Sequence, residues 1–516
     1  MSSRSIDNRY AKRAGVLTVV SLLAKVVGAL YRIPLTNVIG AEGVGLYQLV
    51  FSIYALALAL TSAFSSTLIS RQVSGFLAVG DESGAKGYFF TAASESVLSA
   101  LVAAVVLFLL GGRIAEAQGS AEGALGYRVI APAVLLVAML SAVKGWFNGN
   151  MNLLPSALSV LIEQGVKLGA GIFLATLFRA RGVGVACAAA LAGVTLSELV
   201  ATMTLAILYM KKRSRAPVPH VPFRRVLAEG LPLRLNGLIL PLSVFLDGLL
   251  IVRLLGRFGL TRSEAVASYG IYSGAINSVV NFPVVVVISI AIAVIPLIAR
   301  SKATRDIGTL KGKATLTVKL AVVVSLPAAL ALILLAPQVV RVLYPVFSAE
   351  QQKTAARLLA VGAGSVLFLS LTQIYASLLQ AIDRADVAAE GLAISMLVRV
   401  LLMVFLVPRV GILGIAIATL ISYALATLLN LLKWLQYTGK SENAFKTLAT
   451  VTASGGIMVS AILAPVLLVQ SPVLSLVLSA VIGTVVYLIA ILRLKVFTLG
   501  ELRAMPLSSV TTKLGR

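Results

Sequence analysis

Long apolar windows recur along the whole chain, separated by short polar and basic stretches. Each window has about 20 residues or more, and a helix of that length crosses roughly 30 Å of hydrocarbon. The windows show no alternation of apolar and polar residues of the kind that marks the strands of a membrane barrel. The pattern predicts about fourteen membrane-spanning helices, at 14–37, 45–70, 88–112, 128–147, 155–178, 183–210, 227–252, 268–299, 314–336, 355–380, 387–408, 411–435, 447–469 and 472–494.

The composition indicates the same fold class. Of the 516 residues, 59% are hydrophobic and only 12% are charged, and the mean hydropathy of +1.00 lies far outside the range of soluble domains. We therefore predict an all-α polytopic membrane protein. The single cysteine, Cys187, lies within a predicted span, where we expect it to pack, and the single histidine, His220, lies in a polar loop. These two residues leave no basis for a His/Cys metal site.

Basic residues are distributed unevenly between the two sides of the predicted helices. An even number of spans places both termini on one side, and that side holds most of the 44 Lys and Arg residues, including the clusters KKRSR at 211–215 and RSKATR at 300–305. By the positive-inside rule we predict cytoplasmic N- and C-termini. The first apolar run is longer than the apolar core of a signal peptide, so we expect it to be retained as the first span.

The net charge of +25 follows the predicted cytoplasmic loops. Nucleic acid is therefore not an expected partner, since no soluble domain is present to bind it. Basic loops on the cytoplasmic side instead favour contact with anionic membrane lipids.

A weak internal repeat recurs at an offset of 229 residues. The matched pairs are Arg71 with Arg300, Arg128 with Arg357, Gly182 with Gly411, and Leu191 with Leu420. They fall in spans two, four and six and again in spans eight, ten and twelve, so the matched helices run in the same direction. The repeat predicts two six-helix bundles in parallel repeat, followed by two C-terminal helices, with a substrate path between the bundles.

The predicted organisation has four parts. They are an N-terminal six-helix bundle at 1–210, a basic cytoplasmic linker at 211–226, a C-terminal six-helix bundle at 227–440, and two additional helices with a cytoplasmic tail at 441–516. Three prolines in the linker favour an extended, non-helical chain there.

Several charged residues lie deep within predicted spans, where each costs roughly 3 kcal/mol unless it faces a partner or a water-filled cavity. In the first bundle they are Lys25, Arg32, Glu95, Glu163, Lys167 and Glu198, and in the second they are Arg234, Asp247 and Arg399. Snorkelling to the headgroups and buried structural pairs are the alternatives to a functional role. We predict that Lys25, Arg32 and Arg234 bind substrate and that Glu95, Glu163, Lys167, Asp247 and Arg399 are coupling or cavity charges.

The spacing of these charges suggests what they bind. Lys25 and Arg32 are seven residues apart and therefore share one face of the first helix. Glu163 and Lys167 are four apart and can pair on their own helix. A cavity lined by lysine and arginine suits an anionic ligand, above all phosphate, to which arginine presents a two-pronged fork. We predict no catalytic residues and no metal ligands.

The opening segment YRIPLTNVIGAEGVGLYQ at 31–48 resembles the stage V sporulation protein B family, part of the multidrug/oligosaccharidyl-lipid/polysaccharide exporter superfamily. Supporting matches are YGIYSGAINSVVNFPVVVVISIAIAVIPLIAR at 269–300 and GILGIAIATLISYALATLLN at 411–430. We interpret GAEGVG at 40–45 as the turn that closes the first helical hairpin.

The resemblance implies a protein of the bacterial inner membrane that is related to the lipid II flippases. Its cargo would be a sugar linked to undecaprenyl pyrophosphate, held in a cationic central cavity between two six-helix lobes. Lys25 and Arg32 resemble the basic pair on the first helix of those flippases, although the spacing here is seven and one member is lysine. Asp247 resembles an acidic residue of a sodium site found in some of them, whereas the eleventh span carries Arg399 instead of a second carboxylate. A bound ion and an Asp247–Arg399 salt bridge are competing interpretations.

We therefore predict a flippase for a lipid-linked cell-wall precursor that works by alternating access. It needs no cofactor, and Na⁺ or H⁺ is a candidate coupling ion, because no G-x-x-x-x-G-K-[ST] motif for ATP occurs. The alternatives are a multidrug or cation antiporter, which requires a cavity rich in carboxylates, and a non-transporting scaffold for cell-wall or sporulation enzymes, whose function would survive neutralising the deep charges. We expect a monomer, with cell-wall synthesis enzymes as candidate partners.

Overall fold

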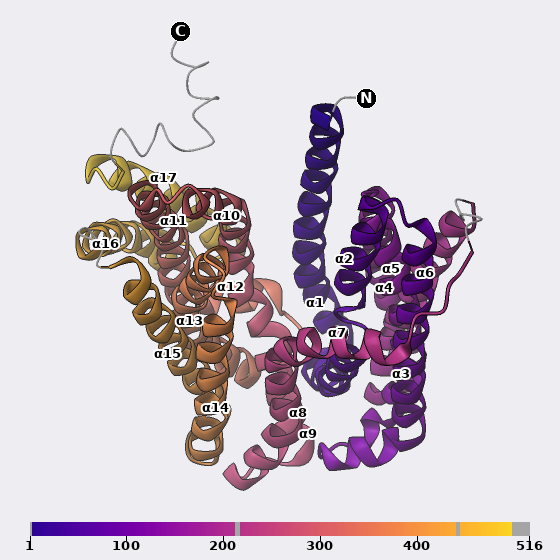
Figure 1. Ribbon diagram of the computed structural model, residues 1–516. Coiled ribbons are helices and arrows are strands. Elements are labelled where there is room, and N and C mark those ends of the chain that lie inside the picture. The colour runs from indigo at the N-terminus through magenta and orange to yellow at the C-terminus, as the bar shows by residue number, and fades with distance from the viewer. Residues whose placement is uncertain (1–2, 212–216, 440–443, 498–516) are drawn as a thin grey trace. The chain divides into compact units, whose positions relative to one another are not determined.

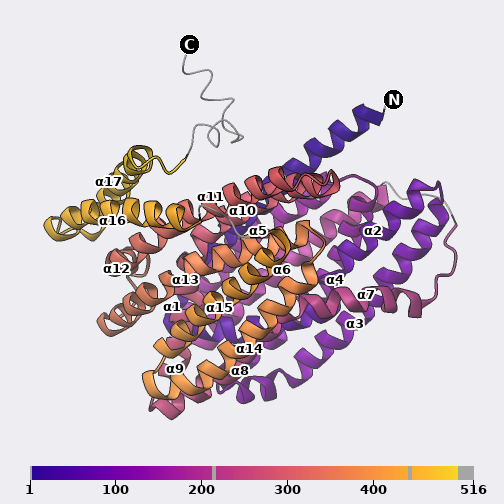
Figure 2. The same ribbon diagram turned by 60° about the vertical axis from the view of Figure 1, so that its left-hand side comes forward.

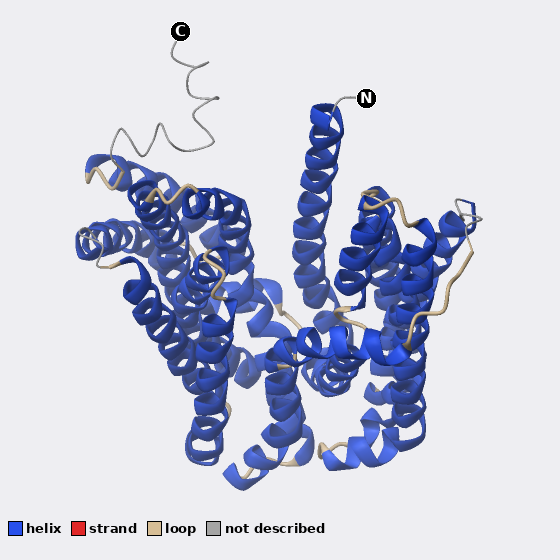
Figure 3. Ribbon diagram, in the orientation of Figure 1, coloured by secondary structure: helices blue, strands red, loops and turns tan. Residues whose placement is uncertain are grey.

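The structure is a computed structural model that describes residues 3–211, 217–439 and 444–497. Helices make up nearly all of these ranges, and no strand occurs in them (Figure 3). Thirteen helical stretches are long and apolar enough to cross a membrane. The first of them, Val26–Ala78, contains the second predicted window and the later part of the first, so the count is consistent with about fourteen spans. The all-α polytopic fold is confirmed.

The helices form two compact units, which are described separately. The first unit contains the described residues up to Ser278 together with Val400–Gly414, and the second contains Val279–Arg399 together with the described residues from Ile415 onward. These units are defined by packing, whereas the four parts predicted from the sequence are defined by membrane spans. The four-part division therefore stays a prediction.

The first unit contains the helical elements of the N-terminal half of the chain (Figure 1). They are α1 (Ser3–Thr61), α2 (Ser65–Ala78), α3 (Glu82–Ala117), η1 (Ala121–Gly123), α4 (Ala124–Gly149), α5 (Leu154–Phe178), η2 (Arg179–Arg181), α6 (Val183–Lys211), α7 (Phe223–Gly237) and α8 (Ile239–Phe258). The short α9 (Arg262–Tyr269) and the π-helix η3 (Gly270–Ile276) complete it. Residues 217–222 of the predicted linker are not helical, as the prolines predict, whereas its residues 223–226 belong to α7 and Lys211 to α6.

The second unit is built on the helices of the C-terminal half (Figures 1 and 2). They are α10 (Asn277–Ala303), α11 (Ile307–Leu334), α12 (Ala336–Leu343), α13 (Ala349–Ala381), α14 (Ala385–Val410), α15 (Leu413–Thr438), α16 (Ala444–Leu468) and α17 (Pro472–Arg493). Its core includes Ile298, Leu379 and Trp434 from α10, α13 and α15. The two additional helices pack on α11, and the Tyr487 hydroxyl of α17 donates to the carbonyl of Val323 over 2.8 Å.

The glycine-rich segment 40–45 is helical except at one residue. Gly40 alone has a non-helical conformation (φ 71°, ψ 179°), and two helical stretches of α1 meet in a kink there, so the turn predicted at GAEGVG is confined to its first glycine. The next glycines serve close packing instead. A Cβ on Gly45 would lie 2.1 Å from the carbonyl oxygen of Val266 in α9, and one on Gly270 would lie 2.1 Å from that of Ala41. The absence of side chains lets these backbones approach each other.

The window predicted at 227–252 is two helices rather than one. α7 ends at Gly237, and α8 begins at Ile239. A Cβ on Gly237 would lie 1.8 Å from Cζ of Phe64, which belongs to the break between α1 and α2. Two breaks that are far apart in the sequence therefore meet in the first unit, where the ring of Phe64 fills the space beside Gly237.

The offset found in the sequence recurs in the helix order. α4, α5 and α6 begin at Ala124, Leu154 and Val183, while α13, α14 and α15 begin at Ala349, Ala385 and Leu413, spacings close to 229 residues. Gly182 and Gly411, one of the matched pairs, both have positive φ values, of 108° and 64°. Each lies just before a helix, where glycine adopts this conformation without steric cost.

Candidate functional site

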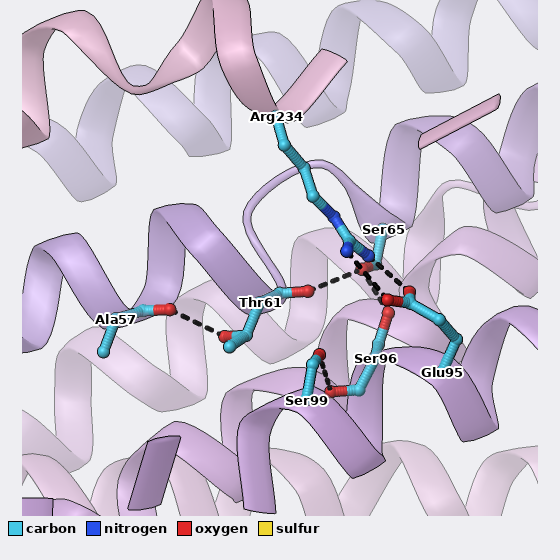
Figure 4. Close-up of polar contacts among 7 residues, drawn as sticks. All are labelled: Ala57, Thr61, Ser65, Glu95, Ser96, Ser99 and Arg234. Atoms are coloured by element: carbon cyan, nitrogen blue, oxygen red, sulfur yellow. Dashed lines mark hydrogen bonds and ion pairs between the residues drawn. The ribbon is translucent and has the colours of Figure 1, made fainter. Parts of the chain in front are cut away.

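A buried ion pair joins α7 to α3 in the first unit (Figure 4). The guanidinium of Arg234 donates from Nη1 to Oε1 of Glu95 over 2.7 Å, and from Nη2 to the second carboxylate oxygen. The side chain of Glu95 is 4% exposed and that of Arg234 is 13% exposed. This two-pronged geometry is the strongest way in which arginine binds an oxyanion. Two residues that the sequence singled out separately are thus brought together.

Small hydroxyl side chains surround the carboxylate of this pair. Ser96 follows Glu95 on α3, and its hydroxyl is hydrogen-bonded to that of Ser65 at the start of α2. The hydroxyl of Thr61, at the end of α1, donates a hydrogen bond to the carbonyl oxygen of Ala57 over 2.8 Å. Figure 4 shows Ser65 and Ser96 beside the carboxylate, whereas the Thr61 hydroxyl points away from it toward Ala57. Glu95 and Arg234 therefore lie in a locally polar part of the bundle.

Glu229 attaches α7 to the first unit at a second point. Its Oε2 accepts hydrogen bonds from the Tyr88 hydroxyl over 2.6 Å and from Gln72 Nε2 over 3.0 Å. Its Oε1 accepts from Nε of Arg225, one turn earlier, over 3.1 Å. The sequence analysis missed Glu229. Its spacing of four residues from Arg225, on the helix that carries Arg234, is the signal that points to it.

The arrangement can exchange one oxyanion for another. The Arg234 side chain is mostly buried, and Glu95 neutralises its charge. The guanidinium has five N–H donors, so it keeps donors beyond the two that bind Glu95. A phosphate group matches the fork as well as a carboxylate does. Since a buried pair loses several kcal/mol when one member is removed, an incoming anion can take the place of Glu95 only by supplying equivalent hydrogen bonds.

Arg32 lies on α1 and reaches toward η3 and α10. Its Nη1 lies 3.5 Å from both the carbonyl oxygen of Ser273 and the hydroxyl of Ser278. Both distances are at the long end for a hydrogen bond. The π-helical stretch that holds Ser273 is a type of local distortion frequent at functional sites. The side chain of Lys25, the other predicted cation of α1, lies outside the described residues.

A second group of charges lies between α4, α5 and α6. The ion pair of Glu163 is formed with Lys144 of α4, at 3.9 Å, in place of the possible pair with Lys167 on its own helix. Lys167 instead lies within electrostatic range of Glu163, Glu198 and Arg32. The sequence analysis did not single out Lys144, which lies near the end of its predicted span. The first unit therefore holds a mixed cluster of acids and bases rather than cations alone.

Asp247 and Arg399 belong to different units. Asp247 is buried on α8 of the first unit, beside Gly248, where a Cβ would lie 2.4 Å from the hydroxyl of Ser52. Arg399 is buried on α14 in the second unit and donates from Nε to the hydroxyl of Thr419 over 3.0 Å. The two competing interpretations of Asp247, an ion site and a salt bridge to Arg399, both stay predictions.

Family models match most of this architecture. The model described as polysaccharide biosynthesis protein matches residues 10–302, which is more than half of the chain. The MatE model matches residues 236–405. Both matches include α8.

Three proteins of Bacillus subtilis (strain 168) are similar to the chain over most of its length. The uncharacterized membrane protein YabM is 26% identical over 529 residues, covering 98% of this chain and 96% of its own. Stage V sporulation protein B is 24% identical, and the match covers 82% of this chain and 82% of that protein. Lipid II flippase MurJ is 23% identical and covers 95% of this chain and 89% of its own.

Two kinds of solved structure share the fold. Lipid II flippase MurJ in an inward closed conformation superposes with a TM-score of 0.74 at 14% identity, covering 92% of this chain and 97% of that one. An inward-facing multidrug resistance transporter of the MATE family in the MOP superfamily has a TM-score of 0.66 at 16% identity, covering 80% and 94%. Both likenesses concern the fold alone.

Proposed function

The chain belongs to the polysaccharide biosynthesis protein family and is a multi-pass membrane transporter or flippase, and from this premise we propose its cargo. We propose that it moves a lipid-linked cell-wall precursor, an undecaprenyl pyrophosphate sugar such as lipid II, across the bacterial inner membrane. Two of its relatives carry the names lipid II flippase and stage V sporulation protein B. These names support a cell-wall cargo. The proposal includes a role in moving such a precursor during sporulation.

The observation in the chain itself that carries the proposal is the buried guanidinium of Arg234. A pyrophosphate is a dense oxyanion, and the fork of Arg234 already binds one oxyanion, Glu95, at both nitrogens. In the proposed mechanism the pyrophosphate takes the place of Glu95 on Arg234, with Arg32 and Lys25 as further cations. The polyprenyl tail remains in the lipid, with α16 and α17 as the proposed neighbours. The protein carries the head group across by alternating access without covalent chemistry.

Coupling to an ion is part of the same proposal. A gradient of Na⁺ or H⁺ or the membrane potential supplies the driving force, since moving one charge through 100 mV is worth about 2.3 kcal/mol. Asp247 is the proposed ion ligand, because it is a buried carboxylate at the start of the C-terminal half. We propose that both termini face the cytoplasm.

The proposal is tested by binding of lipid II to the purified protein in detergent, followed by native mass spectrometry. Arg234→Ala should weaken binding by at least about tenfold, because it removes hydrogen bonds between charged groups. Arg257→Ala is the matched control, since Arg257 is an exposed arginine on α8, and it should bind as the wild type does. If Arg234→Ala is folded and binds lipid II normally, the cationic-site proposal is wrong.

An antiporter for organic cations is the second candidate. It is favoured by the MatE match and by the carboxylates Glu163 and Glu198, which lie close enough to interact in the first unit. The same binding experiment separates the two functions. An antiporter would bind a lipophilic cation such as tetraphenylphosphonium, lose that binding in Glu198→Gln, and show no binding of lipid II in any variant.

A further inference from the structure

A cavity of about 350 Å³ lies within the second unit, separate from the charges of the first unit. It is enclosed by α11, α13, α15 and α16. Its volume falls in the range of sites that hold small ligands. The walls are mostly apolar and include Val318, Tyr375 and Trp434. An occupant of this cavity must therefore be largely hydrocarbon.

One charge lies in this apolar wall. Among the described residues that line the cavity, Lys319 of α11 alone is ionisable to a cation, and it is only 7% exposed. Its Nζ lies 5.2 Å from the centre of the Phe497 ring, which follows α17. A cation over an aromatic face is attracted by the ring electrons. An occupant that carries an anion beside its hydrocarbon would complement both the wall and the lysine.

The cavity lies at the basic ends of its helices. Lys319 is five residues inside the apolar window 314–336, which is about 8 Å along the helix axis, while Lys311 and Lys313 precede it on α11. Trp434 is near the end of α15 and Thr447 is near the start of α16. Both residues therefore lie at the same depth along the helices as Lys319. Tryptophan and lysine are typical of the depth at which lipid headgroups meet hydrocarbon.

We propose that this cavity binds an anionic phospholipid of the surrounding membrane, with one acyl chain in the apolar pocket and the phosphate beside Lys319. Basic pockets between membrane helices at such a level recognise lipid headgroups. The exposed side chain of Leu448 lies at the rim, 46% accessible, and gives the chain an entrance from the bilayer. The bound lipid fills the space between α16 and the helices α11 and α15. It thereby joins the additional helices to the bundle. This inference does not depend on the cargo.

The test is lipid binding measured by native mass spectrometry on the whole protein. The probes are phosphatidylglycerol and phosphatidylcholine with the same acyl chains, and polyprenyl phosphate. We expect the wild type to bind phosphatidylglycerol about fivefold more tightly than phosphatidylcholine. Lys319→Gln should abolish this preference, whereas Lys433→Gln, an exposed lysine of α15, should retain it.

Leu448→Trp provides a second variant that leaves the buried lysine in place. It should narrow the entrance and weaken binding of both phospholipids. Leu448 is exposed, so the larger side chain does not disturb the core. Equal binding of the two phospholipids by the wild type, or an unchanged preference in Lys319→Gln, would overturn the proposal. Tighter binding of polyprenyl phosphate than of phosphatidylglycerol, lost in Lys319→Gln, would also overturn it and assign the cavity to the carrier lipid.

Discussion

At the scale of single residues, Glu95 is the partner that decides what Arg234 can do. The carboxylate accepts hydrogen bonds from Nη1 and Nη2 of the guanidinium, so a substrate anion has to compete with it. Arg234 is therefore a cation with a resident counter-ion rather than a bare positive charge. Neutralising the acid and neutralising the base should have opposite effects on the binding of an anion.

The acid side of the pair gives a prediction of opposite sign to that of Arg234→Ala. Glu95→Gln keeps the shape of the side chain but weakens its hold on the guanidinium, because it is no longer a charged acceptor. We expect lipid II to bind up to about tenfold more tightly to this variant. The measurement is the same titration by native mass spectrometry.

Two controls distinguish replacement of Glu95 by the substrate anion from a structural defect. Glu229→Gln alters the other attachment of α7 and leaves the Arg234 fork in place, so it should not tighten binding. Glu95→Ala strands a buried guanidinium and should destabilise the protein by about 3–5 kcal/mol, measured as a lower melting temperature. Weaker binding to a folded Glu95→Gln variant would disprove the competition, while the effect of Arg234→Ala would still report on the cationic site.

At the scale of helices, the end of α7 packs closely against the segment between α1 and α2. Gly237 leaves room for the Phe64 ring in the break between α1 and α2. The two breaks lie near the polar contacts that attach α7 to α2 and α3 (Figures 1 and 4). Side-chain bulk at position 237 would therefore disturb the segment that positions Arg234.

Gly237→Ala should push the Phe64 ring out of its place and destabilise the protein by about 1–3 kcal/mol, the usual cost of overpacking. The melting temperature of the purified protein checks this. The double variant Gly237→Ala with Phe64→Leu should recover part of the loss, because the smaller side chain makes room for the new methyl group. No recovery would indicate that the backbone, and not the ring, is the obstacle.

At the scale of the whole molecule, orientation in the membrane is open to a direct measurement. Cys187 is buried and is the only cysteine of the chain, so an introduced cysteine can be labelled against a silent background. His220 lies exposed in the linker before α7. We expect His220→Cys to react with a membrane-impermeant maleimide only after cells are permeabilised.

The unsubstituted protein is the control and should remain unlabelled under both conditions. Labelling of His220→Cys in intact cells would place the linker outside and reverse the proposed topology. The flippase proposal itself would survive this result, since the cargo site is independent of which terminus faces the cytoplasm.

The sequence by itself determined the fold class, the number of spans and the repeat. Transfer of a helix into lipid depends on the summed hydropathy of about 20 consecutive residues, which is a local property. The sequence also located the deep charges, because a charge within a membrane span is costly wherever that helix lies in the bundle. Hydropathy did not reveal the break after Gly237, since Gly237 lies in an apolar run, nor its close contact with the distant ring of Phe64.

Only the tertiary structure decided which charges meet. Arg234 and Glu95 are 139 residues apart, and Glu163 pairs with Lys144 on another helix instead of Lys167 on its own. Such pairs depend on how helices are rotated and packed against each other, and hydropathy carries no information about that. The same holds for the cavity beside Lys319, whose walls come from four helices. The sequence supplies the charged and apolar groups, and packing determines which of them form a site.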